Sequence, residues 1–249
     1  MQFVTQGLIV RESPVGESDR LVWILTRDEG LLRAFVRKAK EMKSRTAGAT
    51  QLLCYSDLKI YQGKERYIVS EAKPIRVFFE LYDDITALSL AQYFCELAGK
   101  FAPEGTPAGE YLRLLLNALH YLSKGERPQA VLKASVEMRI LALSGFMPDL
   151  VACAHCGEYL RDRMFFYPQK GTILCQDCYK PSPEPCYELS RGAVSALRHT
   201  IYADFEKLFA FSISPESEKE FAAAAEGYAV SSIGYRMKTL DFYHKILAT

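Results

Sequence analysis

The stretch GLIVRESPVGESDRLVWILTRDEGLLRAFVRKAK, residues 7–40, decides the fold of the N-terminal part of the chain. Segments rich in β-branched and aromatic residues alternate there with turn signals, because "ESPVGESD" and "RDEG" place Pro, Gly and Asp between them. Downstream, "QGKE" is a glycine-bearing hairpin connection between two more such segments. Strands are expected at residues 3–10, 20–26, 31–36, 51–61 and 65–74. Five short strands predict a small closed β-barrel, either an OB-fold or an SH3-like barrel.

A basic run follows the third expected strand. Six cations lie within thirteen residues that hold a single acid, Glu41, and they are Arg33, Arg37, Lys38, Lys40, Lys43 and Arg45. Residues 1–80 carry 14 Lys and Arg against 10 Asp and Glu, so the basic excess of the chain is N-terminal. Such a run is either a solvated surface or a track for a phosphate backbone.

The composition is that of a folded globular protein. Of 249 residues, 49% are apolar and 24% are charged, which suits a buried core and argues against extended disorder. No apolar run approaches the roughly 20 residues that a bilayer span needs. The N-terminus "MQFVTQGLIVRESP" lacks the basic start and apolar core of a secretory signal. We therefore expect a cytoplasmic protein with no membrane partner.

The pattern changes at about residue 81, where apolar residues begin to recur at three- and four-residue spacing. Gly125 is a plausible helix end, Pro128 can open the next helix, and Ser190 is a good N-cap. Helices are expected through residues 88–101, 112–122, 131–143, 194–201 and 231–247. The expected domains are a barrel (1–80), a helical domain in two parts (81–150 and 183–249) and an inserted cysteine module (151–182).

Four cysteines carry the strongest chemical signal. Cys153, Cys156, Cys175 and Cys178 form two C-x2-C pairs separated by eighteen residues, within the spacing window of a four-thiolate zinc site. Four thiolates close the coordination shell of Zn²⁺, so the predicted site is structural rather than catalytic, with an iron site as the alternative. His155 could replace a cysteine, but we expect it to face solvent because it lies inside the first pair. An odd total of seven cysteines also favours a reducing compartment.

Catalytic motifs are absent from the sequence. It holds no phosphate-binding P-loop, no H-E-x-x-H, no G-x-S-x-G and no dinucleotide fingerprint. His120, His199 and His244 lie in separate expected helices without a shared motif, and Asp83 and Asp84 are best placed to complement a helix dipole. We therefore predict that the protein is not an enzyme and assign no catalytic residue.

Nearly the whole chain resembles bacterial RecO, a family of recombination-mediator DNA repair proteins. The resemblance rests on "GESDRLVWILTRDEGLLRAFVRKAK", "LKIYQGKERYIVSEAKPIR", "VEMRILALSGFMPDLVACAHCGE" and "YELSRGAVSALRHTI", in the family's order. It implies an N-terminal OB-fold that binds DNA, a helical domain and an inserted zinc module. One departure is "VRKAKE" where a typical member carries a glycine near "VAKGAR", so the turn after the third strand is expected to differ.

The resemblance also implies an activity and its partners. Members anneal complementary DNA strands and, with RecR, load RecA onto single-stranded DNA covered by single-strand binding protein. The family places the docking site for the acidic tail of single-strand binding protein in the helical domain, and Lys133 and Arg139 are our candidates. In the cell, such a protein would be associated with the nucleoid.

Two considerations favour the phosphate track for the basic run: it follows a barrel strand in the basic part of the chain, and the resemblance assigns DNA binding to that domain. We therefore assign Arg33, Arg37, Lys38, Lys40, Lys43 and Arg45 to binding single- and double-stranded DNA. The alternative is a zinc-containing adaptor that docks proteins without touching DNA. A nuclease with an unrecognised site is a third possibility.

Overall fold

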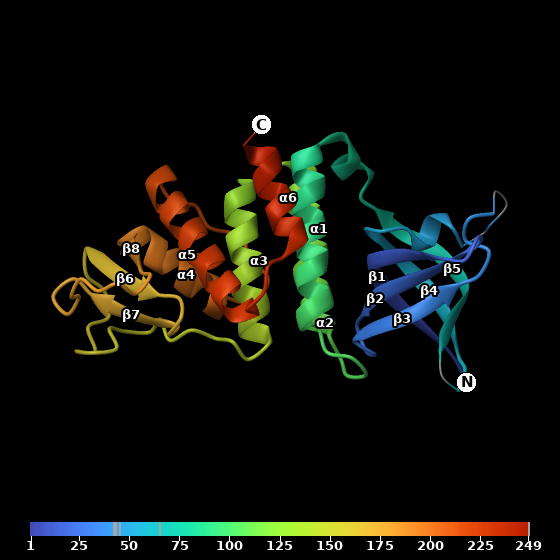
Figure 1. Cartoon of the computed structure of the whole chain (residues 1–249), viewed down its shortest axis with the longest axis horizontal. Coiled ribbons are helices and arrows are strands. Elements are labelled where there is room, and N and C mark those ends of the chain that lie inside the picture. The colour runs from blue at the N-terminus through green and yellow to red at the C-terminus, as the bar shows by residue number, and fades with distance from the viewer. Residues whose placement is uncertain (42–43, 45, 65, 249) are drawn as a thin grey trace. The chain divides into compact units, whose positions relative to one another are not determined.

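The computed structural model describes residues 1–41, 44, 46–64 and 66–248. The chain divides into two compact units, one formed by Met1–Gly125 with Lys238–Thr249 and the other by Glu126–Met237 (Figure 1). Among the described residues, no helix combines the length and apolar character that crossing a membrane requires.

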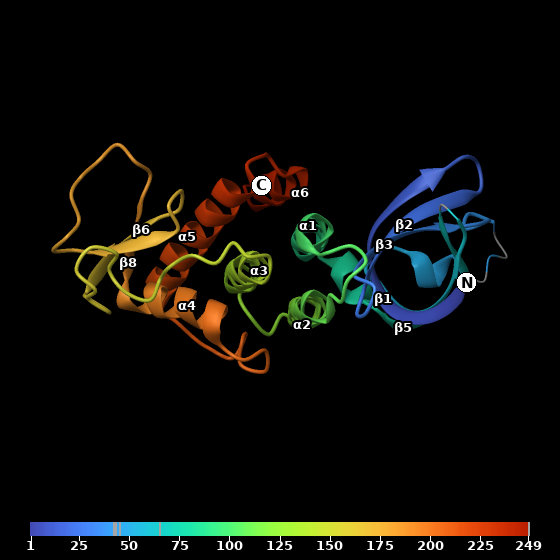
Figure 2. The same cartoon turned by 90° about the horizontal axis from the view of Figure 1, so that it is seen from below.

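The first unit begins with a five-stranded barrel, whose closed ring is visible in Figure 2. Its strands are β1 (Gln2–Val15), β2 (Asp19–Thr26), β3 (Leu31–Val36), β4 (Cys54–Gln62) and β5 (Tyr67–Val77). They pair in the order β1-β2-β3-β5-β4, and β1 closes the ring by pairing with both β2 and β4. Only β3 and β5 run parallel. The barrel is an OB-fold, which is one of the two barrels that the strand pattern allowed and the one that the family resemblance implied.

The barrel is filled by side chains that alternate along its strands between the interior and the outer face. Its buried core is formed by Ile9, Val22, Ile24, Leu32, Ala34, Val36, Ala39, Cys54, Leu58, Ile60 and Val69. On β2 and β3 the intervening residues therefore face outward. β1 is longer than expected, because the segment read as a turn continues along β2 as far as the pair Val15 and Asp19, after a bulge between Ile9 and Arg11.

Helices complete the first unit. They are the 3₁₀ helices η1 (Gly48–Thr50) and η2 (Phe79–Asp83) and the α-helices α1 (Ile85–Phe101), α2 (Gly109–Lys124) and α6 (Lys238–Leu247). The carboxylate of Asp84 caps α1 by accepting from the backbone N–H groups of Thr86 and Ala87. α1 packs against both α2 and α6, and α1 and α2 also contact β1 and β2.

The second unit combines helices with a small sheet. Its elements are α3 (Gln129–Leu143), β6 (Arg163–Tyr167), β7 (Thr172–Cys175), β8 (Tyr187–Ser190), α4 (Arg191–Tyr202) and α5 (Pro215–Ile233). The sheet has the order β7-β6-β8, and α3 packs against α4 and α5. The helix expected over residues 231–247 is two helices, because Gly234 ends α5 in the left-handed conformation with a φ of 72° and α6 starts at Lys238.

Candidate nucleic-acid interface and metal centre

The four cysteines of the predicted metal site lie together in the second unit. All four sulfur atoms are within 4.8 Å of one another, and the sulfurs of Cys156 and Cys175 are 3.7 Å apart. Four sulfurs bound tetrahedrally at about 2.3 Å from a zinc ion would be roughly 3.8 Å from each other. The separation of Cys156 and Cys175 matches this value, and the other sulfurs are close enough to contact the same ion.

Each C-x2-C pair forms a tight turn that aims its two sulfurs at one point. The carbonyl of Cys153 accepts from Gly157 at 2.9 Å, and that of Cys175 accepts from Cys178 at 3.0 Å. Gly157 has a φ of 75°, which suits glycine. The backbone N–H of Ala154 donates to Ile173 on β7 at 2.9 Å and so joins the first turn to the strand that ends at Cys175.

The electrostatics of the cluster favour a cation. Burial opposes ionisation of Cys153, but the backbone N–H groups of Cys156, Cys175 and His155 outweigh it and lower the pKa of Cys153 to about 6. Hydrogen bonds with the side chains of Cys156 and Cys175 raise the pKa of Cys178 to about 12. A cation bound by all four sulfurs would favour the ionised form of each thiol. His155 is exposed, as predicted.

A buried arginine, which the sequence reasoning missed, attaches the cysteine module to α4. The guanidinium of Arg198 donates to the carbonyl oxygens of Leu150 at 2.6 Å, Val151 at 3.1 Å and Tyr159 at 2.6 Å. It also lies 4.1 Å from the ring centroid of Tyr159. The signal available in the sequence was an arginine four residues after Val194, within the apolar stripe of that helix.

The basic run of the barrel is partly on β3 and partly in the turn that follows. Arg33 and Arg37 alternate with the buried Ala34 and Val36, so both arginines face outward. Lys38 has a φ of 53°, unusual for a residue other than glycine. Its backbone N–H donates to the carboxylate of Asp19 at 2.8 Å, which ties this turn to the start of β2.

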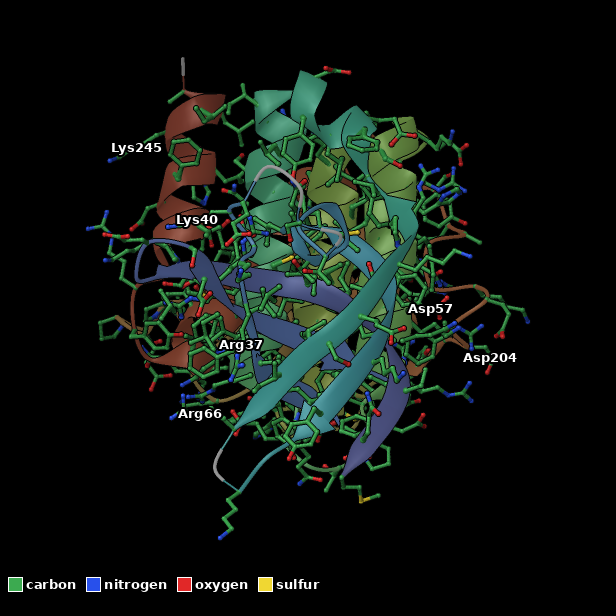
Figure 3. All side chains as sticks on the ribbon, turned by 90° about the vertical axis from the view of Figure 1, so that its right-hand side faces the viewer. Arg37, Lys40, Asp57, Arg66, Asp204 and Lys245 are labelled. Carbon is green, nitrogen blue, oxygen red and sulfur yellow. The ribbon has the colours of Figure 1, made fainter. Side chains whose placement is uncertain are left out.

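The cations of the run differ in their partners. Arg33 pairs with Glu104 at 2.9 Å and Lys38 with Glu41 at 3.5 Å, both with well-exposed side chains. Arg37 and Lys40 are exposed, and Figure 3 shows them with Arg66 on one side of the barrel, whereas Asp57 lies on the opposite side. Lys43 and Arg45 lie outside the described residues. Four of the predicted cations, in residues 33–40, are thus exposed on β3 and the turn that follows it.

The two predicted partner-binding residues lie inside the second unit. Lys133 has 4% of its surface exposed, and its ammonium is 2.7 Å from Glu137 and 2.6 Å from Glu226. Burial lowers the pKa of Lys133, but the two carboxylates outweigh it and the net shift is upward. Arg139 is 8% exposed and donates to the carbonyl of Ala203. Contact of either side chain with a partner stays a prediction.

Comparisons with known proteins cover nearly the whole chain. The family description "Recombination protein O N terminal" matches residues 1–78, and "Recombination protein O C terminal" matches residues 82–240. A "DNA repair protein RecO" of Desulforudis audaxviator is 33% identical over 245 residues, which are 98% of this chain and 97% of that protein. Those of Dehalococcoides mccartyi strain CBDB1 and Acetivibrio thermocellus are 32% and 29% identical over 90% and 96% of this chain, covering 88% and 94% of those proteins.

Proposed function

The chain belongs to the RecO family of DNA repair proteins, and from that membership we propose that it is a non-enzymatic recombination mediator. In this proposal it binds single- and double-stranded DNA and anneals complementary strands. With RecR it helps to load RecA onto single-stranded DNA covered by single-strand binding protein. It would act in the cytoplasm, at the nucleoid.

The observation that carries DNA binding is the segment of exposed cations on the OB-fold. Arg33, Arg37, Lys38 and Lys40 project from β3 and the following turn, and none of the four is buried. Exposed cations that follow one edge of an OB barrel suit a phosphate backbone, because each neutralised phosphate releases condensed counterions. Lys43 and Arg45 would extend the same track along the sequence.

The cysteine cluster fits zinc as a structural ion. The donor set is four thiols, which selects zinc or iron over magnesium or calcium, and the four sulfurs lie within 4.8 Å of one another, close enough to surround one ion. Bound there, Zn²⁺ would neutralise the thiolates and crosslink the two turns. The predicted module, residues 151–182, would then be held in shape without taking part in chemistry.

The proposed docking site for the acidic tail of single-strand binding protein lies in the helical part, near Lys133 and Arg139. Because Lys133 is already paired, a tail carboxylate would reach it by displacing Glu226, whose side chain is 29% exposed. Lys133→Glu and Arg139→Glu should weaken binding of an isolated tail peptide and spare binding to bare DNA. If both variants remain folded and bind the peptide as tightly as the parent, the docking site lies elsewhere on the helical part.

The direct test of DNA binding is a fluorescence-anisotropy titration of the purified protein with a labelled single-stranded oligonucleotide over a range of salt. The logarithm of affinity should fall with the logarithm of salt concentration by about 0.7 per phosphate contact. Strand annealing would be followed in parallel with two complementary labelled oligonucleotides. Absence of any salt-dependent binding would favour the adaptor that docks only proteins.

A further inference from the structure

Aromatic and guanidinium side chains share the outer face of the barrel. In the strand register, Trp23 on β2 lies opposite Arg11 on β1 and opposite Arg33 on β3. Residues directly opposite each other project from the same face of a sheet. Val22 and Ala34, which neighbour this row, belong to the buried core. Arg11, Trp23 and Arg33 therefore form one outward-facing row.

A second outward-facing row, formed by Leu21, Phe35 and Ile68, lies two residues further along the strands. Phe35 on β3 is opposite Leu21 on β2 and Ile68 on β5, so it faces outward as well. Arg37 follows Phe35 by two residues and projects from the same face. Arg66 approaches Phe35 from the start of β5, and Figure 3 shows Arg37 and Arg66 on the same side of the barrel.

In each row a guanidinium covers the aromatic ring. The central carbon of Arg11 is 4.5 Å from the ring centroid of Trp23, and that of Arg66 is 5.4 Å from the ring centroid of Phe35. Both rings are partly exposed, whereas both arginines are exposed. Neither ring fills the barrel core, so core packing does not explain why aromatic residues occupy these positions.

We propose that Trp23 and Phe35 are the stacking platforms on which the barrel holds the bases of single-stranded DNA. When a strand binds, a base replaces the guanidinium over each ring, and Arg11 and Arg66 turn to the neighbouring phosphates. The inference rests on the proposed DNA binding and adds which part of the nucleotide these residues hold. Stacking on a ring is open to every base, so it gives affinity without sequence preference.

The separation of the two rings also determines which form of DNA can stack on both of them. Trp23 on β2 and Phe35 on β3 are diagonal neighbours on adjacent strands, roughly 7–8 Å apart, which is about twice the 3.4 Å rise per nucleotide of one strand in B-DNA. Bases bound to Trp23 and Phe35 are therefore unstacked from each other on a stretched strand. A duplex keeps its bases stacked and paired, so the platforms favour single strands over double strands.

The test uses Trp23 itself, because it is the only tryptophan of the chain. Titration with oligothymidylate should quench its emission in step with binding measured by anisotropy. Titration with an abasic strand of the same length should bind more weakly and leave the emission nearly unchanged. Unaltered emission at saturating oligothymidylate would overturn the role of Trp23.

Variants separate stacking from charge. Trp23→Leu and Phe35→Leu should each weaken binding to oligothymidylate by roughly fivefold to 150-fold, with an unchanged salt slope and unchanged binding to the abasic strand. Trp23→Phe, which keeps a ring, should retain most of the affinity. Phe79→Leu is the matched control, because Phe79 is 68% exposed on η2, outside the two rows. Equal losses on both strands, or none, would contradict the proposal.

Arg11→Ala, unlike the two ring variants, should change the salt dependence: its salt slope should be smaller by about 0.7 for both oligothymidylate and the abasic strand. If the salt slope of this variant equals that of the parent, Arg11 does not move from the Trp23 ring to a phosphate when DNA binds.

Failure of stacking and failure of DNA binding are distinguishable: a parent protein that binds neither strand contradicts the proposed function. A parent that binds both strands equally, through phosphates, contradicts only the platforms. Circular dichroism confirms that each variant is folded.

Discussion

The barrel and the second unit place their charges in opposite ways. The barrel keeps an apolar interior, and the cations of its basic run are outside. Within the described part of the chain, the buried charged side chains all belong to the second unit, and they are Lys133, Glu137, Arg139 and Arg198. Exposed charges contribute little to stability and are available to a ligand, whereas buried charges depend on their partners. The contrast separates exposed cations that DNA can reach directly from buried charged side chains whose pairing also holds the fold.

The largest effect should come from removing the metal ligands of the second unit. Purified protein should carry about one zinc ion per chain, and Cys175→Ser should lose most of it. Structural zinc contributes about 10–16 kcal/mol of apparent binding energy in zinc-finger peptides, so the loss should loosen the cysteine module while the barrel stays intact. Elemental analysis and limited proteolysis measure the two effects.

Cys186→Ser is the matched control for the metal, because Cys186 is partly exposed and lies outside the cluster of four sulfurs. Its metal content and protease resistance should equal those of the parent. A freshly reduced parent protein without zinc or iron would defeat the assignment of the site.

Ion pairs offer the second contrast. Lys133→Met removes a charged partner of Glu137, a side chain with 0% exposure, and should cost about 3–5 kcal/mol of unfolding free energy. Lys59→Met breaks a pair whose side chains are 38% and 70% exposed and should cost less than about 1 kcal/mol. Denaturant unfolding measures both values, and similar costs for the two variants would remove the distinction between the regions.

The raised pKa of Lys133 determines how the stability lost in Lys133→Met depends on pH. A raised pKa means that the ammonium contributes its full stability below its unfolded pKa of about 10.5, and loses it only as pH rises through the higher folded value. For Lys133, the stability gap between the parent and the methionine variant should therefore stay constant across neutral pH.

A smaller effect is expected at Arg198. Arg198→Lys keeps the charge but loses the planar fork that reaches three carbonyl groups, at a cost of about 2–3 kcal/mol. Hydrogen exchange should rise in the segment that includes Leu150 and Tyr159. Arg191→Lys, at a side chain that is 64% exposed, is the control and should leave both stability and exchange unchanged. Unaltered exchange in the Arg198 variant would mean that the module is held to α4 by other contacts.

The smallest effect concerns the turn after β3. Lys38→Gly should raise stability by about 0.5 kcal/mol, because relief of a left-handed backbone worth about 1–2 kcal/mol exceeds the entropic cost of glycine, about 0.5–1 kcal/mol. Lys40→Gly should destabilise instead, since Lys40 lacks a positive φ. Thermal unfolding measures the stability of the two variants against the parent. A loss of stability in both would show that the turn is unstrained.

Sequence patterns predicted the barrel well because its strands alternate between core and surface, and the C-x2-C spacing predicted the cluster because few other structures require it. The helix α5 was missed, since "EFAAAAEGYAV" offers small alanines in place of a wide apolar stripe. The strands β6, β7 and β8 are only four or five residues long, too short for a periodic signal. The burial of Lys133 depends on Glu226, which is distant in sequence and close only after folding. The domain boundaries and the DNA contacts stay predictions.

The measurement that tests the outward charges most directly compares two triple variants of the barrel. One changes Arg37, Lys38 and Lys40 to alanine, and the other changes Lys59, Lys73 and Arg76 on β4 and β5, so that both lose the same charge. The salt slope of single-strand binding should fall by roughly two in the first variant and stay near the parental value in the second. Equal slopes for the two folded variants would contradict the account, because the basic run would then act only through the net charge of the barrel.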